Sequence, residues 1–301
     1  MKSEDILELS RSHINLSEER RAAFKEQVFR GLCFLATILP LCFLSWLLAD
    51  TFIRGFARLN FDFLTGLPSR FAHKAGILPG LVGTLSLMLL TTVIAIPLGI
   101  CAAVYLEEYA KDSWLKKLIE LNVSNLAGVP SIIYGLLGLE LFVRMMNLGP
   151  SLLAGALTMS LLILPVVITS TRESLKTVPS HLREAGLALG ASKLSVIRRV
   201  VLPLAMSQII TGAILSISRA VGESAPLIVL GAATYLAFVP LGVMGEFSAL
   251  PLQIFHWVER PQAAFVDNAA AAIIVLLIIL ALFNGVAAWL RQHHEKKRGG
   301  L

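Results

Sequence analysis

Residues 183–203 read REAGLALGASKLSVIRRVVLP, a charged and small-residue segment that lies between two long apolar runs. Both halves of the segment are made of good helix formers, and Gly190 stands between them. Glycine readily takes the left-handed conformation that ends a helix, and Pro203 either stops the second helix or opens the next apolar run. The pattern predicts two short helices folded into a compact knob. A basic amphipathic helix on a membrane surface fits the spacing equally well.

The rest of the chain is mostly apolar. Of its 301 residues 56% are hydrophobic and only 15% are charged, and the mean hydropathy is +0.75. Soluble domains are about half apolar and about one quarter charged, so this composition indicates a membrane protein. A helix needs roughly 20 apolar residues to span a bilayer. Six runs meet that length, at 31–53, 81–106, 126–143, 151–170, 204 to about 239, and 269–290.

The fifth run is too long for one straight span. It contains Gly212, Gly222, Pro226 and Gly231, which favour a bent or broken helix. A membrane tolerates such a break only where the freed backbone is buried in protein or lines a cavity. This run is therefore a candidate for the part of the protein that moves or meets a solute.

The basic residues are distributed unevenly between the spans. The net charge is +6, and with six spans nineteen Lys and Arg side chains fall on one side and six on the other. The remaining one, Arg219, lies within the fifth span. The positive-inside rule places the richer side, with both termini and residues 183–203, in the cytoplasm. The basic charge thus indicates orientation in a membrane rather than binding of nucleic acid.

Several motifs of chemical function are absent from the sequence. It has no G-x-x-x-x-G-K-[ST] phosphate-binding loop, no H-E-x-x-H and no paired C-x-x-C. We therefore expect no catalytic residue, no metal site and no ATP hydrolysis by this chain, so any uphill transport takes its energy from a partner or an ion gradient. Cys33, Cys42 and Cys101 lie in predicted spans and are expected to be buried small hydrophobic residues.

The spacing within residues 183–203 resembles the E-A-A-x3-G-x9-I-x-L-P signature of permease subunits of ATP-binding-cassette (ABC) importers. Five of the seven positions match, with Gly186 in place of Ala and Val200 in place of Ile. In that family the segment forms the coupling helices, which insert into a cleft of the ATPase subunit. The resemblance implies that four residues of this segment form the insertion: Glu184, Ala185, Gly186 and Gly190. It also implies that Leu202 and Pro203 join the insertion rigidly to the fifth span.

Four further stretches resemble one branch, the second permease subunit of the bacterial high-affinity phosphate importer. They lie at 76–110, 127–143, 218–233 and 249–262, and with the knob they cover most of the chain from residue 76 onward. The resemblance implies an all-α polytopic membrane protein with six transmembrane helices and the MetI-like permease fold. It further implies phosphate import by alternating access, with a second homologous permease, two ATPase subunits that bind Mg-ATP, a periplasmic phosphate-binding protein and membrane lipid as partners.

This interpretation divides the chain into five parts. Residues 1–30 form a cytoplasmic arm with a short amphipathic helix on the membrane surface, residues 31–53 the first span, and residues 54–80 a periplasmic loop. Residues 81–291 form the permease core, with coupling helices at 183–203 and a periplasmic cap at 240–268. In the cap, His256 and Trp257 are expected at the surface, as membrane-interface residues or as a docking surface for the binding protein. Residues 292–301 form a cytoplasmic tail. The whole chain is expected to lie in the bacterial inner membrane.

Arg219 is the candidate for the anion path. A guanidinium group matches phosphate oxygens bidentately, and Arg219 lies 16 residues beyond Pro203, roughly 24 Å along a helix. Glu223 falls one turn later, so the two residues either neutralise one another as a packing pair or face the path together. Both alternatives remain open. Arg172 is expected to contact either the exiting anion or lipid headgroups. Glu107 and Glu108 are expected to be solvated, and Glu140 and Arg144 to form an interfacial ion pair.

Other functions remain open from the sequence. The same architecture serves other oxyanions and amino acids. An ion-coupled secondary carrier or channel needs no ATPase, and a membrane scaffold that senses phosphate need not transport it. Transport driven by ATP would separate the importer from the carrier, and loss of transport without the ATPase would separate it from the scaffold.

Overall fold

The computed structural model describes residues 3–232, 236, 238–239 and 242–298. Among these residues the regular structure is helical apart from one isolated bridge between Ser151 and Glu246. The chain divides into two units, residues 1–53 and residues 54–301. The expected all-α polytopic architecture is therefore confirmed, and each unit has its own organisation.

Nearly all of the first unit belongs to one helix, α1 (Ser3–Phe56). The sequence predicted a separate short surface helix before a span at 31–53, but the helix runs through that boundary without interruption. Residues 17–30, SEERRAAFKEQVFR, explain the difference, because they are mostly strong helix formers with no glycine or proline.

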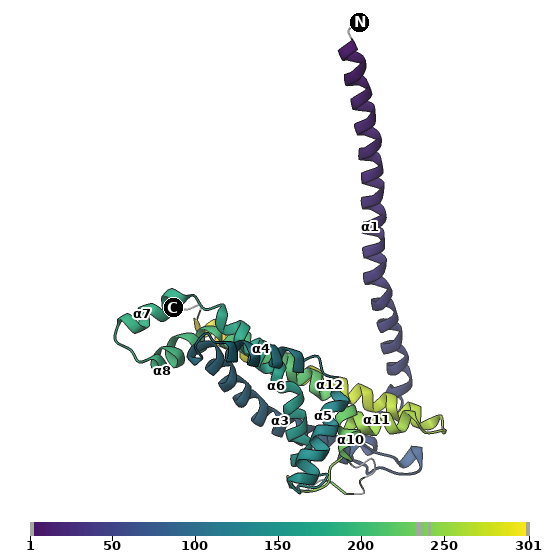
Figure 1. Ribbon diagram of the computed structural model, residues 1–301. Coiled ribbons are helices and arrows are strands. Elements are labelled where there is room, and N and C mark those ends of the chain that lie inside the picture. The colour runs from purple at the N-terminus through teal and green to yellow at the C-terminus, as the bar shows by residue number, and fades with distance from the viewer. Residues whose placement is uncertain (1–2, 233–235, 237, 240–241, 299–301) are drawn as a thin grey trace. The chain divides into compact units, whose positions relative to one another are not determined.

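The second unit, residues 54–301, begins with short elements and then alternates long and short helices (Figure 1). Three of the elements, η2, η3 and η4, are π-helical, and η1 is a 3₁₀ turn. In chain order the elements are α2 (Phe61–Thr65), η1 (Ala72–Lys74), α3 (Leu78–Val104), η2 (Tyr105–Tyr109), α4 (Trp114–Leu126), α5 (Ser131–Gly138), η3 (Leu139–Met145), α6 (Leu152–Lys176), α7 (Ser180–Ala188), α8 (Lys193–Val196), η4 (Ile197–Val201), α9 (Leu202–Val221), α10 (Ala225–Leu230), α11 (Leu250–Val258) and α12 (Ala264–Arg298).

Five helices of the described chain are long and apolar enough to cross a membrane, and a bent pair raises the number to six. The five are Arg21–Phe56, Leu78–Tyr109, Leu152–Lys176, Lys193–Val221 and Ala264–Trp289. The pair joins Trp114–Leu126 to Ser131–Met145 at an angle of 105°. Pro130 precedes the second member, so the expected run at 126–143 is divided, and its helix begins at Ser131.

Helix α6 is the centre of the second unit, and it packs against α3, α5 and α9 (Figure 1). Small residues let these helices approach closely. A Cβ atom added to Gly99 of α3 would lie 2.5 Å from Val167 Cγ1, and one added to Gly212 of α9 would lie 2.6 Å from Ser170 Cβ. Both positions therefore fix how closely α3 and α9 pack on the central helix.

The fifth span is broken, as its glycines and proline predicted. Helix α9 ends at Val221 and α10 begins at Ala225. Gly231 then ends α10 in the left-handed conformation, with φ of 86°. The expected break thus lies at residues 222–224, next to Arg219.

Two expectations about surface residues were wrong. Trp257 was expected at the surface, but it is buried in a cluster with Phe63 and Phe265, because α11 packs against α12. The cysteines were expected to be buried, whereas Cys33, Cys42 and Cys101 are all exposed in this chain. An apolar side chain that faces outward from a membrane helix still avoids water, so composition alone cannot decide between lipid and core.

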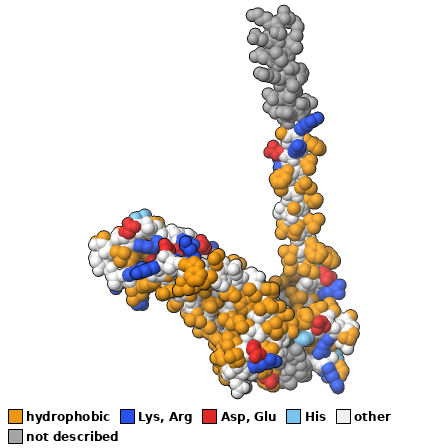
Figure 2. All heavy atoms as spheres, viewed as in Figure 1, with side chains coloured by type: hydrophobic (Ala, Val, Ile, Leu, Met, Phe, Trp, Pro, Cys, Tyr) orange, Lys and Arg blue, Asp and Glu red, His pale blue; other side chains and the backbone are white. Residues whose placement is uncertain are grey.

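Side chains of the second unit are sorted by type along its length. Figure 2 shows a broad surface of hydrophobic side chains, with Lys, Arg, Asp and Glu gathered towards the ends of the unit, among them the end formed by α7 and α8. This banding is typical of a membrane protein, because only the apolar part of the surface can face hydrocarbon.

Candidate coupling surface and anion path

The predicted knob is present as a helix hairpin. Helix α7 covers Ser180–Ala188, and Gly190 has a left-handed φ of 80° in the turn that follows. Ser192 then caps α8, with its side chain accepting a hydrogen bond from the Ser195 N–H. Gly186 faces α8, since an added Cβ would lie 2.9 Å from Val196 Cγ2. The glycine that departs from the family signature therefore allows close packing inside the hairpin.

The tip of the knob is exposed and partly apolar. Glu184, Ala185 and Gly190 are exposed, and so are three leucines around them. Leu187 is 48% exposed, Leu194 55% and Leu189 89%. Three exposed leucines close together on one hairpin make this tip a candidate surface for contact with another protein.

The knob continues directly into the fifth span. Helix α8, the π turn η4 and helix α9 follow one another without a gap, so residues 193–221 form one long helical run. Pro203 lies in the first turn of α9, where proline is tolerated. Pro203 therefore stands at the start of α9 and does not stop the helical run that begins at Lys193. Val201 is fully buried just before Leu202, which supports a stiff junction.

Arg183 anchors the knob to the end of the second span. Its Nε donates to Glu108 Oε1 at 3.0 Å, and its Nη2 lies 2.9 Å from the same oxygen. The two terminal nitrogens also donate to the carbonyl oxygens of Val178, at 2.6 Å, and of Leu175, at 2.8 Å. One side chain thus joins α7, the C-terminal end of α6 and η2.

Arg172 is also paired rather than free. It is buried, and its guanidinium lies 2.6 Å from Glu120 Oε1 on α4 and 3.6 Å from Glu107 Oε2 on η2. The expectation that Glu107 and Glu108 are solvated was therefore wrong, because each is paired with an arginine of another helix. Arg172 meets two carboxylates here, so this geometry gives no support to its predicted place in the anion path.

Arg219 lies in the last turn of α9, at the break in the fifth span. Its side chain is 51% exposed, and its Nε is 3.8 Å from Glu223 Oε1. The pair predicted from the sequence exists, but it is long, and half of the arginine surface faces outward from this chain. A cation inside a span is costly unless protein or water covers it. The guanidinium is therefore accessible from outside this chain, and the pair with Glu223 holds it only at long range.

Neighbouring polar groups are mostly engaged. The Tyr134 hydroxyl of α5 donates to the Leu126 carbonyl oxygen at 2.8 Å and ties α5 to the end of α4. Glu140 and Arg144 form the expected exposed ion pair at 3.0 Å. Neither contact leaves a group positioned for an anion in this conformation.

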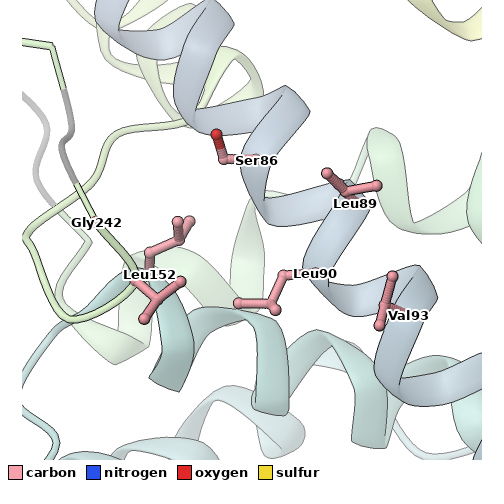
Figure 3. A pocket seen from close by; sticks show the side chains of 7 residues that line it. Ser86, Leu89, Leu90, Val93, Leu152 and Gly242 are labelled. Atoms are coloured by element: carbon pink, nitrogen blue, oxygen red, sulfur yellow. The ribbon is translucent and has the colours of Figure 1, made fainter.

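An apolar hollow of about 350 Å³ opens elsewhere on the unit (Figure 3). Figure 3 shows Leu89, Leu90 and Val93 of α3 on one side and Leu152 of α6 on the other, with one hydroxyl, that of Ser86. No Lys, Arg or His lines it among the described residues. An anion would find no compensating charge there, so this hollow is not a candidate phosphate site.

Sequence reasoning missed the partners of the knob. Glu108 lies 75 residues before Arg183, and Tyr109 84 residues before Lys193, whose Nζ lies 5.1 Å from the centre of the Tyr109 ring. No short spacing reveals such pairs. The sequence did contain a signal for these contacts, because two consecutive acidic residues, Glu107 and Glu108, stand at the end of an apolar run.

Six candidate spans, a broken fifth span and an exposed hairpin knob define a polytopic transport protein with a docking surface. The chain matches the family described as binding-protein-dependent transport system inner membrane component over residues 95–299. It therefore belongs to this family and is a multi-pass permease of the ABC importer type.

Curated relatives agree with this assignment. The phosphate transport system permease protein PstA 1 of Mycobacterium tuberculosis (strain CDC 1551 / Oshkosh) is 38% identical over 251 residues, which are 81% of each chain. The phosphate transport system permease protein PstA of Haemophilus influenzae is 33% identical over 231 residues, 77% of this chain and 81% of that protein. The probable ABC transporter permease protein YqgI of Bacillus subtilis (strain 168) is 33% identical over 236 residues, 78% of this chain and 80% of that protein.

Solved structures share the fold. One inward-facing structure of the MetNI methionine ABC transporter has a TM-score of 0.59 at 19% identity and covers 71% of this chain and 94% of that chain. A bacterial ABC transporter involved in alginate import has a TM-score of 0.61 at 15% identity and covers 89% of this chain and 98% of that chain. These likenesses confirm the MetI-like permease fold.

Proposed function

We propose that this chain is the transmembrane permease subunit of an ABC importer that carries inorganic phosphate into the cytoplasm by alternating access. A partner ATPase binds Mg-ATP and supplies the energy. The observation that supports this most directly is the exposed knob at 183–203, a hairpin with an 89% exposed Leu189 at its turn and a stiff junction to α9. The names of the PstA relatives support phosphate as the solute.

The orientation belongs to the same proposal. The positive-inside rule places the knob and both termini in the cytoplasm, where an ATPase is accessible, and residues 54–80 and 240–268 on the periplasmic side. A phosphate-binding protein would dock on that side, and a second homologous permease would complete the path. Arg219 then faces the path between the two permeases, where its guanidinium compensates the charge of phosphate.

Transport in inverted and right-side-out membrane vesicles tests the proposal. Phosphate uptake that follows ATP supply and persists with an uncoupler supports the importer. Uptake that follows the proton gradient and ignores ATP would establish a secondary carrier instead. Uptake of sulfate or molybdate in preference to phosphate would keep the architecture and change the solute.

Removing the ATPase distinguishes the importer from a phosphate-sensing scaffold that does not transport. Deletion of the ATPase subunit abolishes uptake if this chain is the permease of the importer. Undiminished uptake after the deletion, through this chain alone, contradicts the proposal.

A further inference from the structure

The π turn η2 places three consecutive side chains against three different helices. Glu107 Oε2 lies 3.6 Å from Arg172 Nε of α6. Glu108 Oε1 lies 2.9 Å from Arg183 Nη2 of α7, and the Tyr109 ring lies 5.1 Å from Lys193 Nζ of α8. Consecutive side chains of a helical turn point in different directions around its axis, so these three reach different neighbours.

The ion pairs of this group are mostly shielded from water. The side chain of Glu108 is 8% exposed and that of Arg183 is 23% exposed. The side chain of Arg172 is 10% exposed, that of Glu107 19%, and that of Glu120, its second carboxylate partner, 27%. Removing one member of a shielded pair leaves a charge without compensation, so these contacts resist separation.

An apolar cluster lies beneath the charged contacts. Leu106 of η2, Leu175 of α6 and Val178 are buried together with Val196 of α8 and Val201 of η4. The cluster joins η2, α6, α8 and η4, whereas α7 is held by the contacts of Arg183. The knob is thus attached to the end of α3 by packing as well as by charge.

We propose that residues 107–109 are a clasp that makes the knob move as one body with the adjoining ends of α3 and α6. The inference rests on the proposed function, because it assumes that an ATPase displaces the knob. Without the clasp, displacement of α7 and α8 would reach the spans through their chain connections to α6 and α9 and through the apolar cluster under α8. With the clasp, α3 receives the same displacement directly, so Glu108 and Tyr109 are positioning residues for transport.

A cross-link across the clasp tests rigid-body movement. The variant carries Tyr109→Cys and Lys193→Cys, with Cys33, Cys42 and Cys101 replaced by Ala, and is assembled in the complete transporter. A short bifunctional thiol reagent should join positions 109 and 193, as detected by mass spectrometry of the linked peptides. We expect the cross-linked complex to keep at least half of the ATP-dependent phosphate uptake that the same variant shows before cross-linking. Loss of uptake on cross-linking, or failure of the link to form, would overturn the clasp.

A variant that lacks the clasp contacts provides the complementary test. We expect Glu108→Leu with Tyr109→Leu to lower the phosphate imported per ATP hydrolysed at least fivefold in complexes that retain all subunits. A ratio within twofold of the unchanged protein would contradict the proposal. Tyr109→Phe keeps the ring, and Glu173→Gln removes an exposed pair with Lys176 at 2.9 Å, so both controls should stay within twofold.

The two proposals fail separately. Absence of ATP-dependent uptake by the unchanged complex would refute the proposed function. ATP-dependent uptake by the unchanged complex, together with loss of uptake on cross-linking, would refute the clasp alone.

Discussion

Arg219 is a basic side chain placed at the end of α9 where the fifth span breaks, and half of its surface faces away from this chain. We expect substitutions of Arg219 by Gln and by Lys to lower phosphate uptake to different extents. Arg219→Gln should lower phosphate uptake by at least about tenfold, the loss of about 1.4 kcal/mol of stabilisation, and Arg219→Lys should lower it less, because an ammonium keeps the charge but not the planar fork.

The Arg219 variants need a matched control and a test of assembly. Arg144→Gln removes an arginine from an exposed ion pair on η3 and should leave uptake within twofold. Subunit assembly is measured by co-purification for each variant. Normal uptake in both Arg219 variants would reject the role in the path and leave the packing role.

Arg172 has a structural task that a stability measurement can reveal. Arg172→Leu leaves Glu107 and Glu120 without their cation, and we expect it to lower the free energy of unfolding by about 3 kcal/mol. Thermal unfolding in detergent measures the effect. Adding Glu107→Gln and Glu120→Gln should recover part of the loss. An unchanged melting temperature in the single variant would show that the ion pairs contribute nothing.

At the scale of elements, the turn between α7 and α8 depends on Gly190. Its φ of 80° costs a residue with a Cβ about 1–2 kcal/mol, although the space around it is open. Gly190→Ala should therefore impose backbone strain alone and reduce uptake modestly.

Gly190→Trp adds bulk at the docking surface, and we expect it to uncouple ATP hydrolysis from uptake. The measurement is phosphate imported per ATP hydrolysed, with membrane insertion checked separately. A Trp variant that transports at the normal rate would remove the knob from the coupling mechanism.

Much of this arrangement follows from local sequence. Apolar length predicted the spans, because a bilayer demands about 20 such residues whatever the fold, and Gly190 predicted the turn of the knob. Contacts between distant segments were not predictable in this way. Glu108 meets Arg183 75 residues away, and Trp257 is buried by packing of α11 on α12, which a short aromatic run cannot reveal.

At the scale of the whole molecule, the knob, the clasp and the broken span lie in one connected unit, residues 54–301. The run of residues 193–221 joins the knob to the end of the span that carries Arg219. Force on α7 and α8 therefore acts on the helix that carries the candidate path residue. Coupling through the knob then requires an ATPase that covers the exposed tip.

A photoreactive amino acid at position 189 tests this requirement most directly. In native membranes we expect a light-dependent adduct between this chain and the ATPase subunit. The same residue at position 121, on α4 and also exposed, should give no such adduct. ATP-dependent phosphate uptake by a chain whose position 189 never forms an adduct with the ATPase would contradict the account.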